Sequence, residues 1–196
     1  MMLSALENRR QIVHLLGGVL YVVLIYFDIL TVYVAAALIG AYILLSLIFK
    51  KYKIPILYDI LKQLDRPKDL KTFPIKGNVW YAVGVFISLL IFPKDVAMAS
   101  LIILALGDSI APLIGQYGKL KHPFNKKKYI EGSIAGAIAG FLGALIFVSW
   151  YVALPAAVAA MIAEGVGLKV GRKPVDDNII IPFVAGVVIL FLRMLI

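Results

Sequence analysis

The sequence predicts an all-α integral membrane protein, a polytopic bundle of about seven transmembrane helices with a cytoplasmic amino terminus. Hydrophobic residues make up 62% of the 196 residues, and the mean hydropathy of +0.97 lies far above that of soluble domains. Several apolar runs are long enough to cross a bilayer core, which takes about 20 residues. Basic residues fall between these runs in a pattern that indicates an orientation.

The apolar residues divide into seven predicted spans within one transmembrane domain, 1–196. The spans are 11–27, 29–49, 77–93, 95–115, 132–149, 151–165 and 178–195. The first two join around Asp28, and the fifth and sixth join at Trp150 and Tyr151. Both junctions are too short for a loop, so we expect each to be a tight hairpin.

The distribution of Lys and Arg tests this division, because segments that stay in the cytoplasm retain positive charge. With the amino terminus inside, 18 of the 20 basic residues fall on the cytoplasmic side, and only Lys94 and Arg193 fall outside. The same assignment gathers five acids at or near that side: Asp108, Glu131, Glu164, Asp176 and Asp177. One face therefore combines acids for a divalent cation with bases for phosphates.

Composition excludes several kinds of site. The chain has no Cys, which rules out disulfides, thiolate nucleophiles and cysteine metal sites. The net charge of +9 resides in loops between apolar runs and fits anionic lipid headgroups. No nucleic-acid motif is present, so we expect the bilayer, and no nucleic acid, as a partner.

Asp108 stands near the end of the fourth span, where a carboxylate is costly and usually functional. Pro112 has no N–H and clashes with the carbonyl of Asp108, four residues back, so we predict a kink that frees this oxygen beside the carboxylate. The freed carbonyl oxygen and the carboxylate of Asp108 would then face one ligand. The alternative is an acid that pairs with a lysine at the membrane interface.

A segment rich in Gly and Lys follows the fourth span. Gly115 and Gly118 would let the backbone approach a phosphate closely, or they would simply end a helix. Lys119, Lys121 and the run 126–128 come next. Lysines of this kind bind phosphates or contact lipid headgroups, and the residues alone leave both interpretations open.

Glu131 opens the fifth span, where the positive end of a helix suits both a carboxylate and a bound phosphate. The alternative is an ordinary favourable residue in the first turn. Gly132, Gly136 and Gly140 follow at intervals of four residues. Such a stripe of small residues predicts close packing against another membrane helix.

The last polar group joins the sixth and seventh spans. Glu164 ends the sixth span, and Asp176, Asp177 and Asn178 open the seventh. Pro182 follows Asn178 at the same spacing as Pro112 follows Asp108. Carboxylates and an amide donate hard oxygen ligands, which suit Mg²⁺ better than Zn²⁺. The alternative is a solvated loop.

Arg9, Arg10 and His14 share one helical neighbourhood at the amino terminus. Arginines at a cytoplasmic helix end commonly set topology, and a lone histidine in an apolar helix is commonly a packed residue rather than a base. The residues alone therefore give these positions little functional weight.

In their order along the chain, these motifs resemble the CTP-dependent lipid kinases, the family of dolichol kinase, phytol kinase and yeast-type diacylglycerol kinase, which is related to phosphatidate cytidylyltransferases. The matching motifs are Glu7 and Arg9-Arg10 with His14, Gly107-Asp108 with Ala111, Gly115 and Gly118, a lysine cluster before Glu131-Gly132-Ser133, and Glu164 before Asp177-Asn178 and Pro182. The chain departs from the family at Arg10, where Lys is usual, and at Tyr129, where a small hydroxyl residue is usual.

The resemblance implies an enzyme that uses Mg²⁺ to transfer the terminal phosphoryl group of CTP to a membrane-embedded alcohol. A polyprenol, dolichol or geranylgeraniol is implied rather than diacylglycerol. Asp108 and Glu131 would bind Mg²⁺, with Glu164 or Asp177 as a further ligand or base. The implied nucleotide and phosphate contacts are Arg9, Arg10, Gly107, Gly115, Gly118, Lys119, Lys121, Lys128 and Asn178. The site would face the cytoplasm, from the plasma membrane if the cell is prokaryotic.

Two rival functions remain. A cytidylyltransferase would join CTP to a lipid phosphate, release pyrophosphate and use the same metal and phosphate contacts. A small ion-coupled transporter would use its acids to carry ions. The chain shows no internal repeat, and its acids gather at one face rather than mid-span, so the sequence favours an enzyme.

Overall fold

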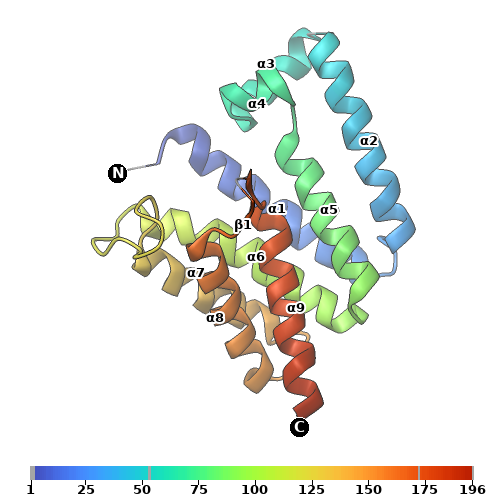
Figure 1. Ribbon diagram of the computed structural model, residues 1–196. Helices are drawn as coiled ribbons and strands as arrows, with labels where there is room; N and C mark the ends of the chain where they lie inside the picture. The colour runs from blue at the N-terminus through green and yellow to red at the C-terminus, as the bar shows by residue number, and fades with distance from the viewer. Residues whose placement is uncertain (1–2, 53, 172, 196) are drawn as a thin grey trace.

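The computed structural model describes residues 3–52, 54–171 and 173–195. This part of the chain is almost entirely helical, with one short two-stranded antiparallel ribbon (Figure 1). The elements are α1 (Ala5–Tyr26), α2 (Val32–Lys51), α3 (Pro55–Leu64), α4 (Pro67–Thr72), α5 (Lys76–Ile91), α6 (Lys94–Gly115), α7 (Ile130–Ala144), α8 (Trp150–Val166), β1 (Lys169–Val170), β2 (Lys173–Pro174) and α9 (Asp177–Leu195).

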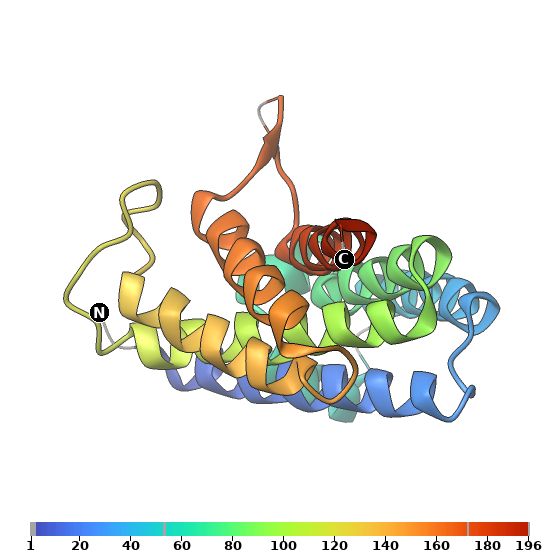
Figure 2. The ribbon, with the colours of Figure 1, turned by 90° about the horizontal axis from the view of Figure 1, so that it is seen from below.

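Helix α6 forms the centre of the bundle. It contacts α1, α5, α7, α8 and α9, and 14 of its 22 residues are buried. Figure 2 shows α6 between α1 on one side and α8 and α9 on the other. Asp108 therefore stands on the helix that contacts most of the other described helices.

The predicted stripe of small residues on α7 is confirmed as the contact with α6. A Cβ atom at Gly136 would lie 2.7 Å from the carbonyl oxygen of Gly107, and one at Gly140 would lie 3.4 Å from the Cα of Ile103. At Gly132 a Cβ would collide with the α6 backbone. At Gly132 and Gly136 only glycine allows this approach, which fixes the amino end of α7 beside the carboxyl end of α6.

Four helices, α1, α2, α6 and α9, are long and apolar enough to cross a membrane, and α5, α7 and α8 are shorter apolar helices. The chain is therefore a helical membrane protein, as the sequence predicts. The count of seven spans and the cytoplasmic amino terminus stay predictions. Of the basic residues assigned to the cytoplasm, Lys53 and Arg172 lie outside the described residues.

The two basic residues assigned to the other side of the membrane lie at one end of the bundle. Lys94 pairs with Asp28 at 2.6 Å, and Arg193 pairs with Asp95 at 2.6 Å. These pairs tie the end of α1 and the end of α9 to the start of α6. Each of these two positive charges is thus paired with a nearby acid, so the described residues at this end of the bundle have no excess of bases over acids.

The predicted hairpins differ from the structure. Residues 27–31 join α1 to α2, but the two helices diverge, and α2 packs against α5 instead (Figure 1). Helix α7 ends at Ala144, and the turn to α8 occupies residues 145–149, ahead of the predicted junction. Ser149 takes an extended conformation as the residue before α8, so the turn precedes Trp150 rather than including it.

The basic segment between α2 and α5 contains two helices that the sequence analysis did not predict. Both α3 and α4 begin with proline, which is favourable at the first helical position. Asp65, between them, accepts a hydrogen bond of 2.6 Å from the backbone N–H of Ile75. This bond anchors the segment to the start of α5 and brings Arg66 to α1.

Candidate active site

A cavity of about 820 Å³ opens where α6 ends and α7 and α9 begin. Its wall is built from α1, from each of the helices α4 to α9 and from the loop 116–129, so segments far apart in the sequence meet here. Seven of the predicted site residues line it: Arg10, Asp108, Gly115, Lys128, Glu164, Asp177 and Asn178.

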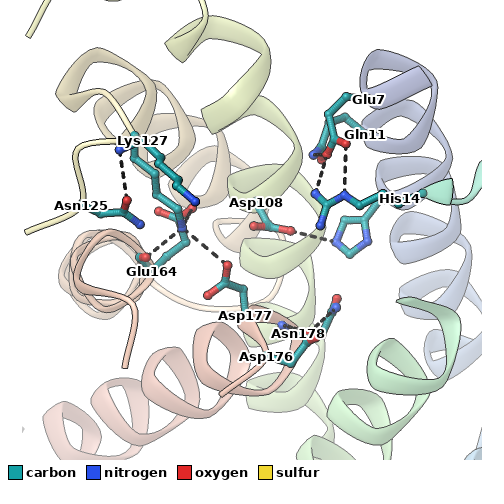
Figure 3. A network of polar contacts seen from close by, with 12 residues as sticks. Glu7, Gln11, His14, Asp108, Asn125, Lys127, Glu164, Asp176, Asp177 and Asn178 are labelled. Atoms are coloured by element: carbon teal, nitrogen blue, oxygen red, sulfur yellow. Dashed lines mark hydrogen bonds and ion pairs between the residues drawn. The ribbon is translucent and has the colours of Figure 1, made fainter. Parts of the chain in front are cut away.

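Three acids from three helices converge on this cavity. Asp108 of α6, Glu164 of α8 and Asp177 of α9 each offer an oxygen atom, and these atoms lie within 4.8 Å of one another. Figure 3 shows the three side chains directed toward one region. We call them the acid trio. Carboxylates this close repel each other unless a cation neutralises them.

Lys128 supplies one positive charge to the acid trio. Its Nζ atom pairs with the carboxylate of Glu164, lies 2.9 Å from the Glu164 carbonyl oxygen and 3.5 Å from Asp177 Oδ2. Burial disfavours the charged ammonium, but the charges of Glu164 and Asp177 outweigh this effect and raise the pKa of Lys128. One protonated lysine thus faces three carboxylates, which leaves the cluster with a net negative charge.

Two oxygen atoms at the cavity are buried without a hydrogen-bond partner among the described residues: Oε2 of Glu164 and Oδ1 of Asn178. Buried polar atoms almost always have a partner, and Glu164 is only 4% exposed. An oxygen-only donor set with uncompensated negative charge is what Mg²⁺ binds. The residues present therefore fit a magnesium ion.

His14 approaches the acid trio from α1. Its Nε2 atom lies 3.4 Å from Asp108 Oδ2, and its ring stacks on Tyr81 at a centroid distance of 4.4 Å. Figure 3 shows Asp108 between His14 on one side and Asp177 on the other. The sequence analysis gave His14 little weight because nothing in the sequence shows what an apolar helix packs against.

Arginine side chains form another part of the cavity wall. Arg10 pairs with Glu7 at 2.8 Å, and Arg66 pairs with the same carboxylate at 3.0 Å. Lys127 also lines the cavity. Arg66 and Lys127 are site residues that the sequence analysis did not select, because each lies in a basic segment where no spacing distinguishes it from its neighbours.

The structure does not bring the other predicted residues to the cavity wall. Arg9 is exposed and binds Gln63, and Gly107 is buried against α7. Lys119 and Lys121 are exposed. The predicted residues that do not line the cavity are Arg9, Gly107, Gly118, Lys119, Lys121 and Glu131.

Glu131 lies outside the acid trio, and its carboxylate contacts the loop before α7, so its role as a magnesium ligand stays a prediction. It accepts hydrogen bonds from the backbone N–H groups of Lys119 at 2.7 Å and Leu120 at 3.0 Å. A Cβ at Gly118 would lie 2.8 Å from its Oε2 atom, so glycine makes room for this contact. Glu131 thus holds the loop that carries Lys128, and Glu164 completes the acid trio.

Comparisons with known proteins give partial matches. The chain is 36% identical over 133 residues to an uncharacterized protein of Methanocaldococcus jannaschii, which covers 66% of each chain. It is 38% identical over 73 residues to CTP-dependent diacylglycerol kinase 1 of Saccharomyces cerevisiae, covering 37% of this chain and 24% of the relative. It is 29% identical over 131 residues to probable phytol kinase 1 of Glycine max, covering 64% of this chain and 43% of the relative.

No protein-family model matches the chain, and no solved structure matches it. The matched segments span less than half the length of the kinases named above. The predicted relation to cytidylyltransferases stays a prediction. Over the part of the chain that they match, these relatives support a CTP-dependent lipid kinase family.

Proposed function

We propose that the chain is a magnesium-dependent lipid kinase that transfers the terminal phosphoryl group of CTP to the hydroxyl group of a membrane isoprenoid alcohol. Polyprenol, dolichol and geranylgeraniol are the substrates we expect. The site faces the cytoplasm, from the plasma membrane if the cell is prokaryotic. The observation that carries this proposal is the acid trio beside Lys128, on the wall of a cavity that also bears arginines.

Phosphoryl transfer depends mainly on neutralising phosphate charge and on aligning the attacking oxygen. A bound Mg²⁺ ion would neutralise part of this charge and would orient the phosphate oxygens. Asp108, Glu164 and Asp177 are the side chains that would hold it, through the oxygens that lie within 4.8 Å of one another.

The positive residues of the cavity wall would bind the remaining phosphate charge. Lys128 already contacts two members of the acid trio, so it lies next to any group held there. Arg10 and Arg66 share Glu7 as a partner, which orients both guanidinium groups at the wall. Guanidinium groups in this position bind phosphate oxygens through two parallel hydrogen bonds.

The proton of the attacking hydroxyl group also needs an acceptor. Asp108 is the member of the acid trio that contacts a histidine rather than Lys128. Its Oδ2 atom lies 3.4 Å from Nε2 of His14, so this carboxylate is not held by the ammonium group that pairs with Glu164. We assign proton uptake to Asp108 on this ground.

A cytidylyltransferase is the second candidate. The cavity wall carries Lys76, Arg66 and Lys127 in addition to Lys128 and Arg10. Such a surplus of positive charge would also suit the phosphate group of a lipid phosphate substrate. The two reactions differ in which phosphorus atom reaches the lipid.

The test uses purified protein in detergent with Mg²⁺ and CTP labelled at either the γ or the α phosphorus. Kinase activity transfers the γ label to a lipid alcohol, whereas a cytidylyltransferase transfers the α label to a lipid phosphate and releases pyrophosphate. Asp108→Asn should abolish transfer. Asp59→Asn is the matched control, because Asp59 is an exposed acid that pairs with Lys62 away from the cavity. Transfer of neither label, or full activity in Asp108→Asn, would refute the proposal.

A further inference from the structure

A second cavity, of about 410 Å³, lies between α7 and α8. Helix α7 contributes one face from Ile130 to Phe141, and α8 contributes Leu154, Val158 and Ile162, among others. We call this cavity the α7–α8 groove. None of its lining residues is an acid, a lysine or an arginine, and its polar members, His122 and Ser133, both lie toward the loop end.

The α7–α8 groove adjoins the cavity of the acid trio. Ser133 lines both cavities. Met161 lines the groove and stands three residues before Glu164, on the same side of α8. Its sulfur atom would lie 2.8 Å from a Cβ at Gly107, so Met161 packs where α6, α7 and α8 meet. The inner end of the groove is therefore one helical turn from a carboxylate of the trio.

The outer side of the groove opens toward the surroundings of the protein. Ile134, Ile138 and Ile162 are 55%, 54% and 56% exposed. For helices in a bilayer, exposed isoleucines face lipid chains. The groove follows α7 from Ile130 to Phe141, which is about 16 Å at the helical rise of about 1.5 Å per residue. That length is about half of the hydrocarbon core, which is about 30 Å thick.

From this arrangement we infer that the α7–α8 groove binds the hydrocarbon chain of the lipid alcohol, with the hydroxyl end at Ser133. The mainly apolar lining fits a hydrocarbon chain and offers no acid, lysine or arginine to a charged headgroup. The depth fits a chain that enters sideways from one leaflet, and Ser133 gives its polar end a neighbour at the boundary between the cavities. The inference rests on the proposed function for the identity of the bound lipid.

Ala137→Phe tests the groove, because it fills the middle of the groove with an aromatic ring and leaves the cavity of the trio untouched. The KM for a long-chain alcohol should rise by about tenfold or more, since losing even one methylene contact in an apolar pocket has an effect of about this size. The KM for a short prenyl alcohol should stay the same. Ala135→Phe, on the same helix but outside both cavities, is the control.

A binding measurement without CTP keeps the test valid if Ala137→Phe fails to fold. A long-chain alcohol that carries a diazirine on its chain is photo-crosslinked to the wild-type protein, and the labelled peptides are mapped. Labels within 130–141 and 154–162 that excess unlabelled alcohol removes would support the inference. Labels that map to α2 or α5, or that do not compete, would overturn it.

The two experiments separate this inference from the proposed function. Groove labelling without any phosphoryl transfer would support the groove and refute the kinase. Phosphoryl transfer to long-chain alcohols that is the same in Ala137→Phe and Ala135→Phe would support the kinase and refute the groove. Equal loss of activity on short and long alcohols in Ala137→Phe alone would also count against the groove, because the chain should matter only where it is bound.

Discussion

Replacing Lys128 with methionine removes the positive charge from the acid trio while keeping a side chain of similar length. Glu164, whose side chain is 5% exposed, would then lose its ion-pair partner. Losing one partner of a buried pair costs about 3–5 kcal/mol. Because the Lys128 side chain is 27% exposed, we expect the lower end, about 3 kcal/mol. For a chain of this size, that corresponds to a fall in Tm of about 6–12 °C.

The assay is thermal unfolding in detergent without Mg²⁺, followed by circular dichroism. Lys128→Met with Glu164→Gln should recover most of the loss, because the double variant removes one positive and one negative charge of the same ion pair and leaves the net charge of the cluster unchanged. Lys62→Met is the matched control. Its partner Asp59 is 68% exposed, so this surface pair should contribute little to stability.

Added Mg²⁺ should stabilise Lys128→Met more than the wild-type protein, because the acid trio then lacks its own cation. Two results would refute the reasoning. One is a Tm of Lys128→Met within about 2 °C of wild type, which is under 1 kcal/mol for this chain length. The other is a double variant that unfolds at a lower temperature than Lys128→Met itself.

Gly136→Ala would place a methyl group 2.7 Å from an α6 carbonyl oxygen and should destabilise the protein by about 1–3 kcal/mol. Gly40→Ala, with nothing within 4 Å, should be neutral or stabilising in the same unfolding assay. Trp80 lines the cavity of the trio and is one of two tryptophans. In a Trp150→Phe variant, in which Trp80 is the remaining tryptophan, CTP should change the fluorescence, and no change at saturating CTP would contradict nucleotide binding in this cavity. Glu131→Gln should weaken Mg²⁺ binding, measured by calorimetry, less than a substitution of any member of the acid trio does. Equal weakening would indicate that Glu131 is itself a ligand.

The sequence predicted the main helices because long apolar runs and charged gaps are local features. The stripe Gly132, Gly136 and Gly140 also predicted close helix packing, since small residues at that spacing have one common physical use. Asp108, Glu164 and Asp177 were selected because acids at the ends of apolar runs are costly. These three predictions needed no knowledge of which helices become neighbours.

The contacts of Glu131 could not be predicted from the sequence. A glutamate in the first turn of a helix can face a ligand or accept hydrogen bonds from the preceding loop, and the choice depends on the path of that loop. Here the loop turns back through Gly118, so Lys119 and Leu120 present their N–H groups to the carboxylate. Arg66 was missed for a similar reason, because only the fold brings α3 and the residue that follows it, Arg66, to α1.

Binding of Mn²⁺ measured by electron paramagnetic resonance, in the presence of CTP, tests the central claim most directly. Mn²⁺ takes the same oxygen ligands as Mg²⁺. The account predicts bound Mn²⁺ in the wild-type protein and in the surface control Asp59→Asn, and loss of the bound signal in Asp108→Asn, Glu164→Gln and Asp177→Asn. Unchanged Mn²⁺ binding in these three variants, or none in the wild-type protein, would contradict the acid trio as a metal centre.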